Sequence, residues 1–253
     1  MTLATNPSPI PCKICGRESP LFSVHDFTKS CLEANGTKLP LSGIPIYYRQ
    51  CRQCGFIFTD AFDDWSKDEF STHIYNSDYA IVDPDVTGLR PKNNAVMING
   101  AFGKQKDAIR VLDYGGGNGD LAVALRSCGF SVETYDPFSQ FSEKPSGAFN
   151  LITAFEVFEH SLSPHDLLDD ISSYHPVDAL VLFSTLVTEA DPVNIARNSW
   201  YVAPRNGHVS IYARSSLNLL FSQHGYQWLS ASGDTHIHIA FMRLPAFASH
   251  LFA

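Results

Sequence analysis

Apolar segments of two kinds alternate through the second half of the chain. Short apolar runs predict strands, and apolar residues spaced three or four positions apart predict helices. Strands are expected at 109–114, 131–136, 149–155, 179–185, 226–232 and 236–244. Helices are expected at 94–102, 120–128, 164–174 and 215–224, the last with a Ser cap and Gly225 as its stop. This alternation predicts an α/β sheet with helices on both faces and an antiparallel pair of strands at one edge.

A glycine-rich turn joins the strand at 109–114 to the helix at 120–128. Its residues include Gly115, Gly117, Asn118 and Gly119. Glycine lets the backbone turn tightly and approach a ligand without a Cβ clash. The N-terminus of the following helix offers N–H groups and the positive end of a dipole. The turn therefore predicts a small-molecule site at the carboxyl end of a parallel sheet.

The type of nucleotide is left open by this turn. Gly117-x-Gly119-x-x-Ala122 fits the dinucleotide fingerprint with its permitted final Ala. Asp136 follows the second strand, where a carboxylate can accept hydrogen bonds from the ribose hydroxyls of either NAD or S-adenosylmethionine. Both cofactors therefore remain candidates at this point.

Two cysteine pairs near the N-terminus predict a metal site. They are Cys12-Lys-Ile-Cys15 and Cys51-Arg-Gln-Cys54, each followed by glycine. Four thiolates suit tetrahedral Zn²⁺, and a closed shell of four cysteines leaves no position open for a substrate. We therefore expect a structural zinc in a module too small to bury a core of its own.

Composition narrows the class of protein and its location. The formal net charge of −8 argues against a nucleic-acid partner. No apolar run reaches the roughly 20 residues of a membrane span, and the N-terminus lacks the apolar core of a signal peptide. We therefore expect a cytoplasmic protein. Its expected segments are a flexible tail (1–11), a zinc-binding module (12–58), a helical connection that contributes to the active site (59–105), the catalytic domain (106–245) and a C-terminal tail (246–253).

Three motifs in order resemble those of class I S-adenosylmethionine-dependent methyltransferases. Leu112-Asp113-Tyr114-Gly115-Gly116-Gly117-Asn118-Gly119 looks like their first motif, Tyr135-Asp136-Pro137 like their second, and the stretch 149–160, ending in Glu159-His160, like their fourth-strand motif. The resemblance covers roughly residues 108 to 244. It implies a Rossmann-like sheet, here preceded by a small zinc-ribbon-like module.

The resemblance also assigns cofactor contacts. Asp113 would lie near the methionine ammonium, Asp136 would bind the ribose, and Glu156 would flank the reacting methyl group. The full set that it implies for the cofactor is Asp113, Gly115, Gly117, Asn118, Gly119, Asp136, Pro137, Phe155 and Glu156.

The order of zinc module, tyrosine segment and methyltransferase domain is similar to that of zinc-containing sugar methyltransferases, some of which methylate carbon. In that resemblance, His208 matches the histidine proposed as base, and Tyr75 or Tyr79 matches an active-site tyrosine. His160 is a second candidate base, because the usual pKa of histidine suits proton transfer near neutral pH.

Three departures separate the chain from the carbon-methylating enzymes. Gly207 stands where they have Glu, Arg205 stands where they have Tyr, and we expect their large C-terminal domain to be lacking. In addition, only 12 residues lie between Asp136 and Phe149. The sheet should therefore be abbreviated between its second and fourth strands, and Phe138 or Phe141 is expected to pack against adenine.

We accordingly expect an S-adenosylmethionine-dependent methyltransferase that acts on a small or carrier-linked polar substrate, such as a nucleotide sugar or a glycan. Two alternatives are an NAD-dependent sugar-modifying enzyme and a non-enzymatic zinc adaptor with a degenerate methyltransferase domain. The Tyr-x-x-x-Lys pair of short-chain dehydrogenases has no counterpart in the sequence, which disfavours the first alternative.

Overall fold

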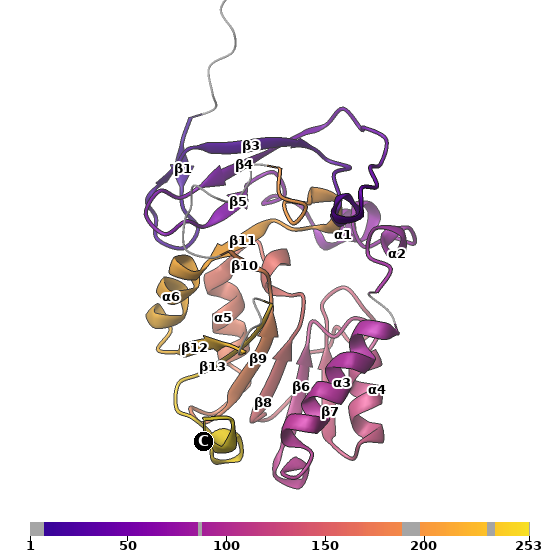
Figure 1. The fold of residues 1–253 in the computed structure, drawn as a ribbon, viewed down its shortest axis with the longest axis vertical. Helices are drawn as coiled ribbons and strands as arrows, with labels where there is room; N and C mark the ends of the chain where they lie inside the picture. The colour runs from indigo at the N-terminus through magenta and orange to yellow at the C-terminus, as the bar shows by residue number, and fades with distance from the viewer. Residues whose placement is uncertain (1–7, 86–87, 189–197, 232–235, 253) are drawn as a thin grey trace, which may run out of the picture.

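The computed structural model describes residues 8–85, 88–188, 198–231 and 236–252. Two sheets organise these residues, one above the other (Figure 1). A six-stranded sheet has the order β12-β13-β9-β8-β6-β7. Its strands are β6 (Arg110–Tyr114), β7 (Ser131–Tyr135), β8 (Leu151–Ala154), β9 (Leu180–Ser184), β12 (Gln227–Ser230) and β13 (Ile237–Phe241).

Four strands of this sheet are parallel, and the edge pair is not. β6 pairs in parallel with β7 and β8, and β8 pairs in parallel with β9. β13 runs antiparallel to both β9 and β12. The antiparallel edge is as predicted. Residues 136–150 contain no helix or strand, so the predicted abbreviation after the second strand is also confirmed.

Helices cover both faces of the sheet because successive strand residues point to opposite sides. Val111 packs with the helices α3 (Leu89–Phe102) and α4 (Asp120–Ser127). Its neighbour Leu112 packs with α5 (Pro164–Ser172) and α6 (Arg214–Gln223). Two shorter helices, α1 (Lys67–His73) and α2 (Tyr79–Val82), precede α3 in the connection.

Some predicted boundaries need correction. α3 begins at Leu89 rather than residue 94, because Pro91 is tolerated in a first helical turn. α6 is not capped by a serine at its start: Ala213 is the cap residue, and its N–H donates to Ser216 Oγ at 3.0 Å. The end of the strand predicted at 226–232 lies outside the described residues.

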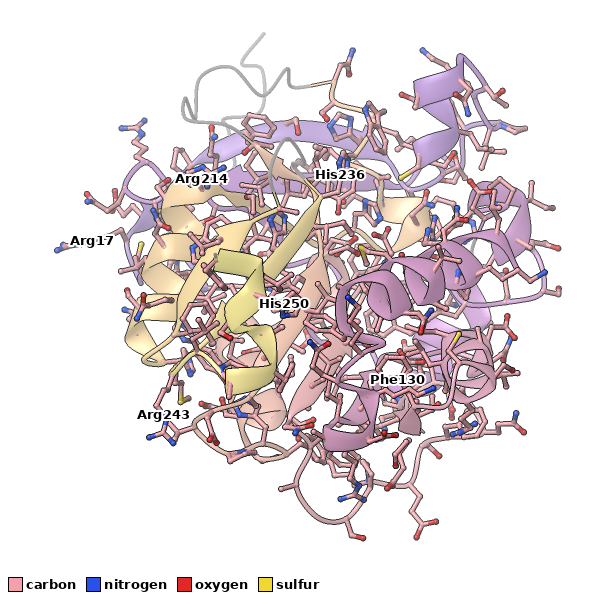
Figure 2. The ribbon with its side chains drawn as sticks, turned by 60° about the horizontal axis from the view of Figure 1, so that its bottom comes forward. Arg17, Phe130, Arg214, His236, Arg243 and His250 are labelled. Atoms are coloured by element: carbon pink, nitrogen blue, oxygen red, sulfur yellow. The ribbon has the colours of Figure 1, made fainter. Side chains whose placement is uncertain are left out.

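Both ends of the described chain are ordered where tails were expected. Ile10 and Pro11 form β1, which pairs with β2 (Glu18–Ser19). The C-terminal residues form the 3-10 helix η5 (Ala246–Phe252). His250 Nε2 donates a hydrogen bond at 2.8 Å to the carbonyl of Ala101, and His250 lies beside α3 (Figure 2).

The second sheet joins distant parts of the chain. Its order is β10-β11-β5-β4-β3. Its members are β3 (Leu21–Asp26), β4 (Pro45–Gln50), β5 (Ile57–Thr59), β10 (Val187–Thr188) and β11 (Ser210–Ala213). β11 runs antiparallel to β5, with Ile211 opposite Ile57. The segments predicted as a zinc module and as a catalytic domain therefore share one sheet.

Four short 3-10 helices lie between these elements: η1 (Cys31–Asn35), η2 (Lys106–Ala108), η3 (Phe158–His160) and η4 (Pro204–Asn206). No helix of the described residues is long and apolar enough to cross a membrane.

Candidate active site

The predicted cofactor residues gather at the carboxyl ends of the parallel strands. The glycine turn follows β6, and Gly115, Gly117 and Gly119 all have positive φ values, between 55° and 80°. A Cβ on Gly115 would lie 2.4 Å from Val157 Cγ2, and one on Gly119 would lie 3.0 Å from the Phe141 ring. The turn therefore requires glycine for both its backbone conformation and its close packing.

The turn offers fewer free N–H donors than predicted. The amides of Gly115 and Gly116 donate to Tyr135 O, at 2.7 and 3.3 Å, and that of Gly119 donates to Gly116 O at 2.9 Å. The Gly117 amide donates to Asp136 Oδ2 at 2.9 Å. A ligand would therefore meet the turn mainly through its backbone surface and through the carboxylate of Asp136.

Two carboxylates lie on either side of this turn. Asp136 is held by the amides of Gly117 and Phe138, which leaves lone pairs on both oxygens for ribose hydroxyls. Asp113 is buried, and its Oδ1 accepts from Thr153 Oγ1 at 3.1 Å. Its Oδ2 has no hydrogen-bond partner. Burial raises the pKa of Asp113 to about 7.

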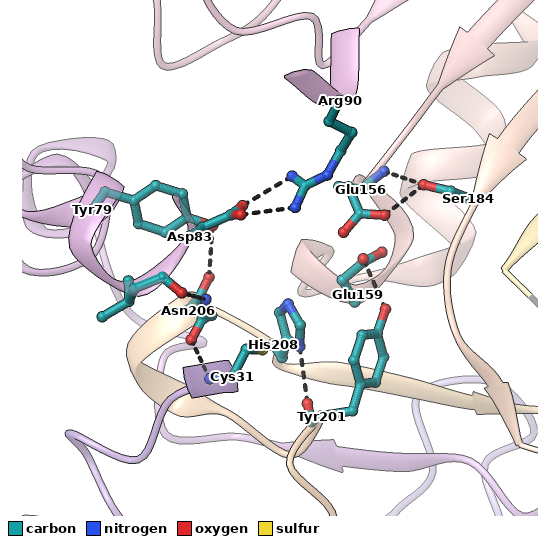
Figure 3. Close-up of polar contacts among 11 residues, drawn as sticks. Cys31, Tyr79, Asp83, Arg90, Glu156, Glu159, Ser184, Tyr201, Asn206 and His208 are labelled. Atoms are coloured by element: carbon teal, nitrogen blue, oxygen red, sulfur yellow. Dashed lines mark hydrogen bonds and ion pairs between the residues drawn. The ribbon is translucent and has the colours of Figure 1, made fainter. Parts of the chain in front are cut away.

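Glu156 follows β8 in a strained conformation. It is the one non-glycine residue with positive φ (55°) among the described residues, and such strain is concentrated at functional sites. Its amide donates to Ser184 Oγ at 2.8 Å, and Ser184 Oγ donates back to its carboxylate at 2.7 Å (Figure 3). Phe155, by contrast, packs on the apolar cluster between the sheet, α3 and α4.

The two candidate histidines lie together on the other side of the site. The rings of His160 and His208 have centroids 5.1 Å apart. His208 is 4% exposed. Burial lowers the pKa of both imidazoles, and the nearby His160 lowers that of His208 further. Both side chains are therefore neutral at neutral pH.

The predicted tyrosines line the same region. Tyr75 packs against Tyr79, with ring centroids 5.3 Å apart, and against His160 at 6.0 Å. Its ring centroid also lies 5.1 Å from that of Phe138. Tyr75 therefore lies between His160 and Phe138, which follows the predicted cofactor residues Asp136 and Pro137. The Tyr79 hydroxyl donates to Asn206 O at 3.3 Å. Pro137 is half-buried and Asn118 is exposed.

Residues 198–209, the loop before β11 that carries His208 (the His208 loop), are held by side chains that the sequence did not indicate. The buried Tyr48 hydroxyl donates to His208 O at 2.7 Å. Lys29 Nζ donates to the carbonyls of Ser199 and Val202, both at 2.8 Å. No local pattern announces these contacts, because the partners lie more than 150 positions apart in the chain.

Two pairs of polar residues complete the site. The buried Glu159 accepts from the Tyr201 hydroxyl at 2.8 Å, and Arg90 pairs with both carboxylate oxygens of Asp83 (Figure 3). The sequence did point to Glu159, because this residue precedes His160 in the Glu-His pair at the end of the fourth-strand motif. Arg90 lies in the first turn of α3, and Asp83 and Tyr201 lie outside helices and strands; the sequence gives no local sign that tertiary packing brings them here.

The four predicted cysteine ligands form one group. Sulfur atoms of Cys12 and Cys54 lie 3.7 Å apart, and those of Cys15 and Cys51 lie 3.4 Å apart. A tetrahedral ion with 2.3 Å bonds to sulfur holds its ligands about 3.8 Å apart, so the donor set and its spacing fit such an ion. The remaining cysteines, Cys31 and Cys128, lie elsewhere and are free thiols.

Comparison with known proteins places this site in a family. The profile of a family described as a methyltransferase domain matches residues 89–231. The match spans more than half of the 253 residues, and the chain belongs to this family. The predicted class of enzyme, a methyltransferase, is confirmed. Comparison with curated proteins gives no significant match.

Two solved structures share the fold. The mitomycin 7-O-methyltransferase MmcR is 13% identical, with a TM-score of 0.50, and the alignment covers 70% of this chain and 60% of that one. An O-methyltransferase family protein from Burkholderia thailandensis is also 13% identical, with a TM-score of 0.50, and the alignment covers 72% of this chain and 64% of that one. This chain thus spans less than two thirds of either protein. The predicted α/β methyltransferase fold is confirmed.

Proposed function

We propose that the chain transfers the methyl group of S-adenosylmethionine to a small or carrier-linked polar acceptor, such as a sugar hydroxyl. The observation that carries this proposal is Asp113 Oδ2, a buried carboxylate oxygen without a partner beneath the glycine turn. A Cβ on Gly116 would lie 2.3 Å from this oxygen. Glycine at position 116 therefore lets the turn lie directly against the carboxylate, and the unpaired oxygen would be an acceptor for a cationic group such as the methionine ammonium.

The remaining cofactor assignments form part of the same proposal. Asp136 would bind the ribose hydroxyls, and Glu156 would lie beside the methionine portion. S-Adenosylmethionine supplies an electrophilic methyl group, so the protein mainly aligns and activates the acceptor. The neutral imidazoles of His160 and His208 face the acceptor side, where an Nε2 lone pair can take the proton of a hydroxyl. Tyr75 and Tyr79 would line this side.

The cysteine group has a structural role in this proposal. Zn²⁺ bound by Cys12, Cys15, Cys51 and Cys54 would have a closed shell without an open position for substrate. Its effect would be to fix the turns that lead into the second sheet, and through this sheet the His208 loop.

Calorimetry and a methyl-transfer assay test the proposal. We expect the purified chain to bind S-adenosylmethionine but not NAD, and to transfer tritiated methyl groups to members of a panel of nucleotide sugars and glycan fragments. Asp113→Asn should weaken cofactor binding about 10-fold or more, because it removes a charge-assisted interaction. Absence of S-adenosylmethionine binding would overturn the proposal.

His208→Ala separates catalysis from cofactor binding. The variant should lose turnover, while its Kd for S-adenosylmethionine should stay within about twofold of that of the wild type, because His208 lies on the acceptor side. His250→Gln, an exposed histidine beside α3, is the matched control and should retain turnover. Unchanged turnover in His208→Ala would remove His208 from the mechanism.

A further inference from the structure

The two active-site histidines have a defined arrangement of protons. His160 Nδ1 lies 3.1 Å from Gly207 O, and His208 Nδ1 lies 2.9 Å from Tyr201 O. A carbonyl oxygen only accepts hydrogen bonds, so each Nδ1 must carry the proton. In a neutral imidazole the other nitrogen then holds a free lone pair. Both Nε2 atoms are therefore available as acceptors or as metal ligands.

Glu159 brings a third unpaired donor to the same place. Its side chain is fully buried, and its Oε1 accepts from the Tyr201 hydroxyl. Its Oε2 has no hydrogen-bond partner. One ligand atom each from Glu159, His160 and His208 can be chosen so that all three lie within 4.8 Å of one another. A buried carboxyl oxygen without a hydrogen-bond partner is costly, so a cation bound at this oxygen would remove that cost.

We propose that Glu159, His160 and His208 bind a divalent transition-metal ion on the acceptor side of the active site. Two imidazoles and one carboxylate form a ligand set that binds zinc or iron and leaves coordination positions open. Metal-binding histidines generally donate their other ring N–H to a carbonyl or carboxylate, as both histidines do here. This site differs in ligand type from the four-cysteine group.

The environment supports a cation at this position. Glu156 lies near Glu159, so two carboxyl groups face the same region (Figure 3). The positive charge of Arg90 is taken up by Asp83 in a bidentate pair. A proton acceptor needs only one free lone pair, whereas three residues with possible ligand atoms lie together here. The arrangement therefore goes beyond what a single histidine base requires.

The chemistry of the metal site rests on the proposed methyl transfer. A bound divalent ion would act as a Lewis acid and would lower the pKa of an acceptor hydroxyl. A lone pair that binds a metal cannot also take a proton, so His160 and His208 would serve as bases only in the metal-free site. With the ion bound they would act as ligands, and the hydroxyl proton would be released to water as the methyl group moves from sulfur to oxygen. The substrate class narrows accordingly to molecules whose acceptor is an oxygen able to coordinate a metal.

Counting metal ions tests the site directly. The full chain is loaded with Zn²⁺, dialysed against metal-free buffer, and analysed by elemental mass spectrometry. We expect Glu159→Gln and His208→Ala to hold one zinc fewer per chain than the wild type, and His250→Gln to hold the same number. Because the difference is measured rather than the total, occupancy of the cysteine group does not affect the result.

Two controls keep the outcome decisive. Truncating the buried His208 leaves a cavity, so the nearly isosteric Glu159→Gln decides the matter if the other variant fails to fold, as judged by circular dichroism. An equal zinc count in Glu159→Gln and the wild type would overturn the proposal. Calorimetry with S-adenosylmethionine on the same samples separates the two proposals. Loss of zinc with an unchanged cofactor Kd supports the metal site, and absence of cofactor binding in every sample overturns only the methyl transfer.

Discussion

Gly207 illustrates how a single residue shapes this active site. In the sequence it stands out as a departure from the sugar methyltransferases. In the structure its φ is +81°, and a Cβ would lie 3.1 Å from Ile74 and 3.2 Å from His160 Nδ1. Its carbonyl also lies within hydrogen-bond distance of that nitrogen. The absence of a side chain thus allows the His208 loop to approach His160.

Gly207→Ala should therefore harm both stability and turnover. The left-handed backbone alone should cost about 1–2 kcal/mol of unfolding free energy, and the close contacts should displace His160. Urea denaturation and the methyl-transfer assay measure the two effects. Gly100→Ala is the control: Gly100 lies in α3 with open space around its Cβ position, so alanine should stabilise by about 0.5–1 kcal/mol. Equal stability of the two variants would contradict this reading.

The elements differ in how readily the sequence predicts them. β8 and β9 are buried and largely apolar, and β6 is apolar at Val111 and Leu112, so these strands can be recognised without any tertiary information. The site residues at the ends of β6 and β8 and in the turns after them, Asp113 to Gly119 and Glu156 to His160, could be located for the same reason. Tyr48 could not, because its partner His208 lies 160 positions away and is brought to it by the pairing of β11 with β5.

Tyr48→Phe tests whether β4 positions the catalytic loop. The change removes a buried hydroxyl and leaves His208 O without its partner, which should cost about 1–3 kcal/mol of unfolding free energy. Turnover should fall, while the Kd for S-adenosylmethionine should not change. Tyr47→Phe, on the same strand with a side chain that is 38% exposed, should alter neither quantity. If Tyr48→Phe behaves like Tyr47→Phe, β4 has no role in positioning His208.

At the scale of the whole molecule, the cysteine turns and the active site belong to one connected structure. Cys51 and Cys54 lead directly into β5, and the Thr59 amide donates to Val209 O, next to His208. The Val209 amide in turn donates to Glu159 O. A change at the cysteine group can therefore reach both sides of the proposed acceptor site through backbone hydrogen bonds.

Cys51→Ser should consequently lower more than zinc content. A ligand present at about 1,000 times its Kd stabilises by about 4 kcal/mol, so loss of the zinc should lower Tm by about 10 °C. Turnover should fall at temperatures where the variant remains folded. Cys128→Ser, which changes a thiol outside the group, is the control. Thermal unfolding with and without added Zn²⁺ measures the effect, and an unchanged Tm for Cys51→Ser would argue against a structural zinc.

The pairing of β5 with β11 also affects synthesis of the chain. Ile57 and Phe58 leave the ribosome about 150 residues before their partners Ile211 and Ser210. At about 5–20 residues per second, the apolar edge of β5 waits roughly 8–30 s for its neighbour. Unpaired strand edges are prone to pair with other chains. Until residues 210–213 emerge, the strand that will later support the His208 loop thus has an unpaired edge that is exposed to misassembly.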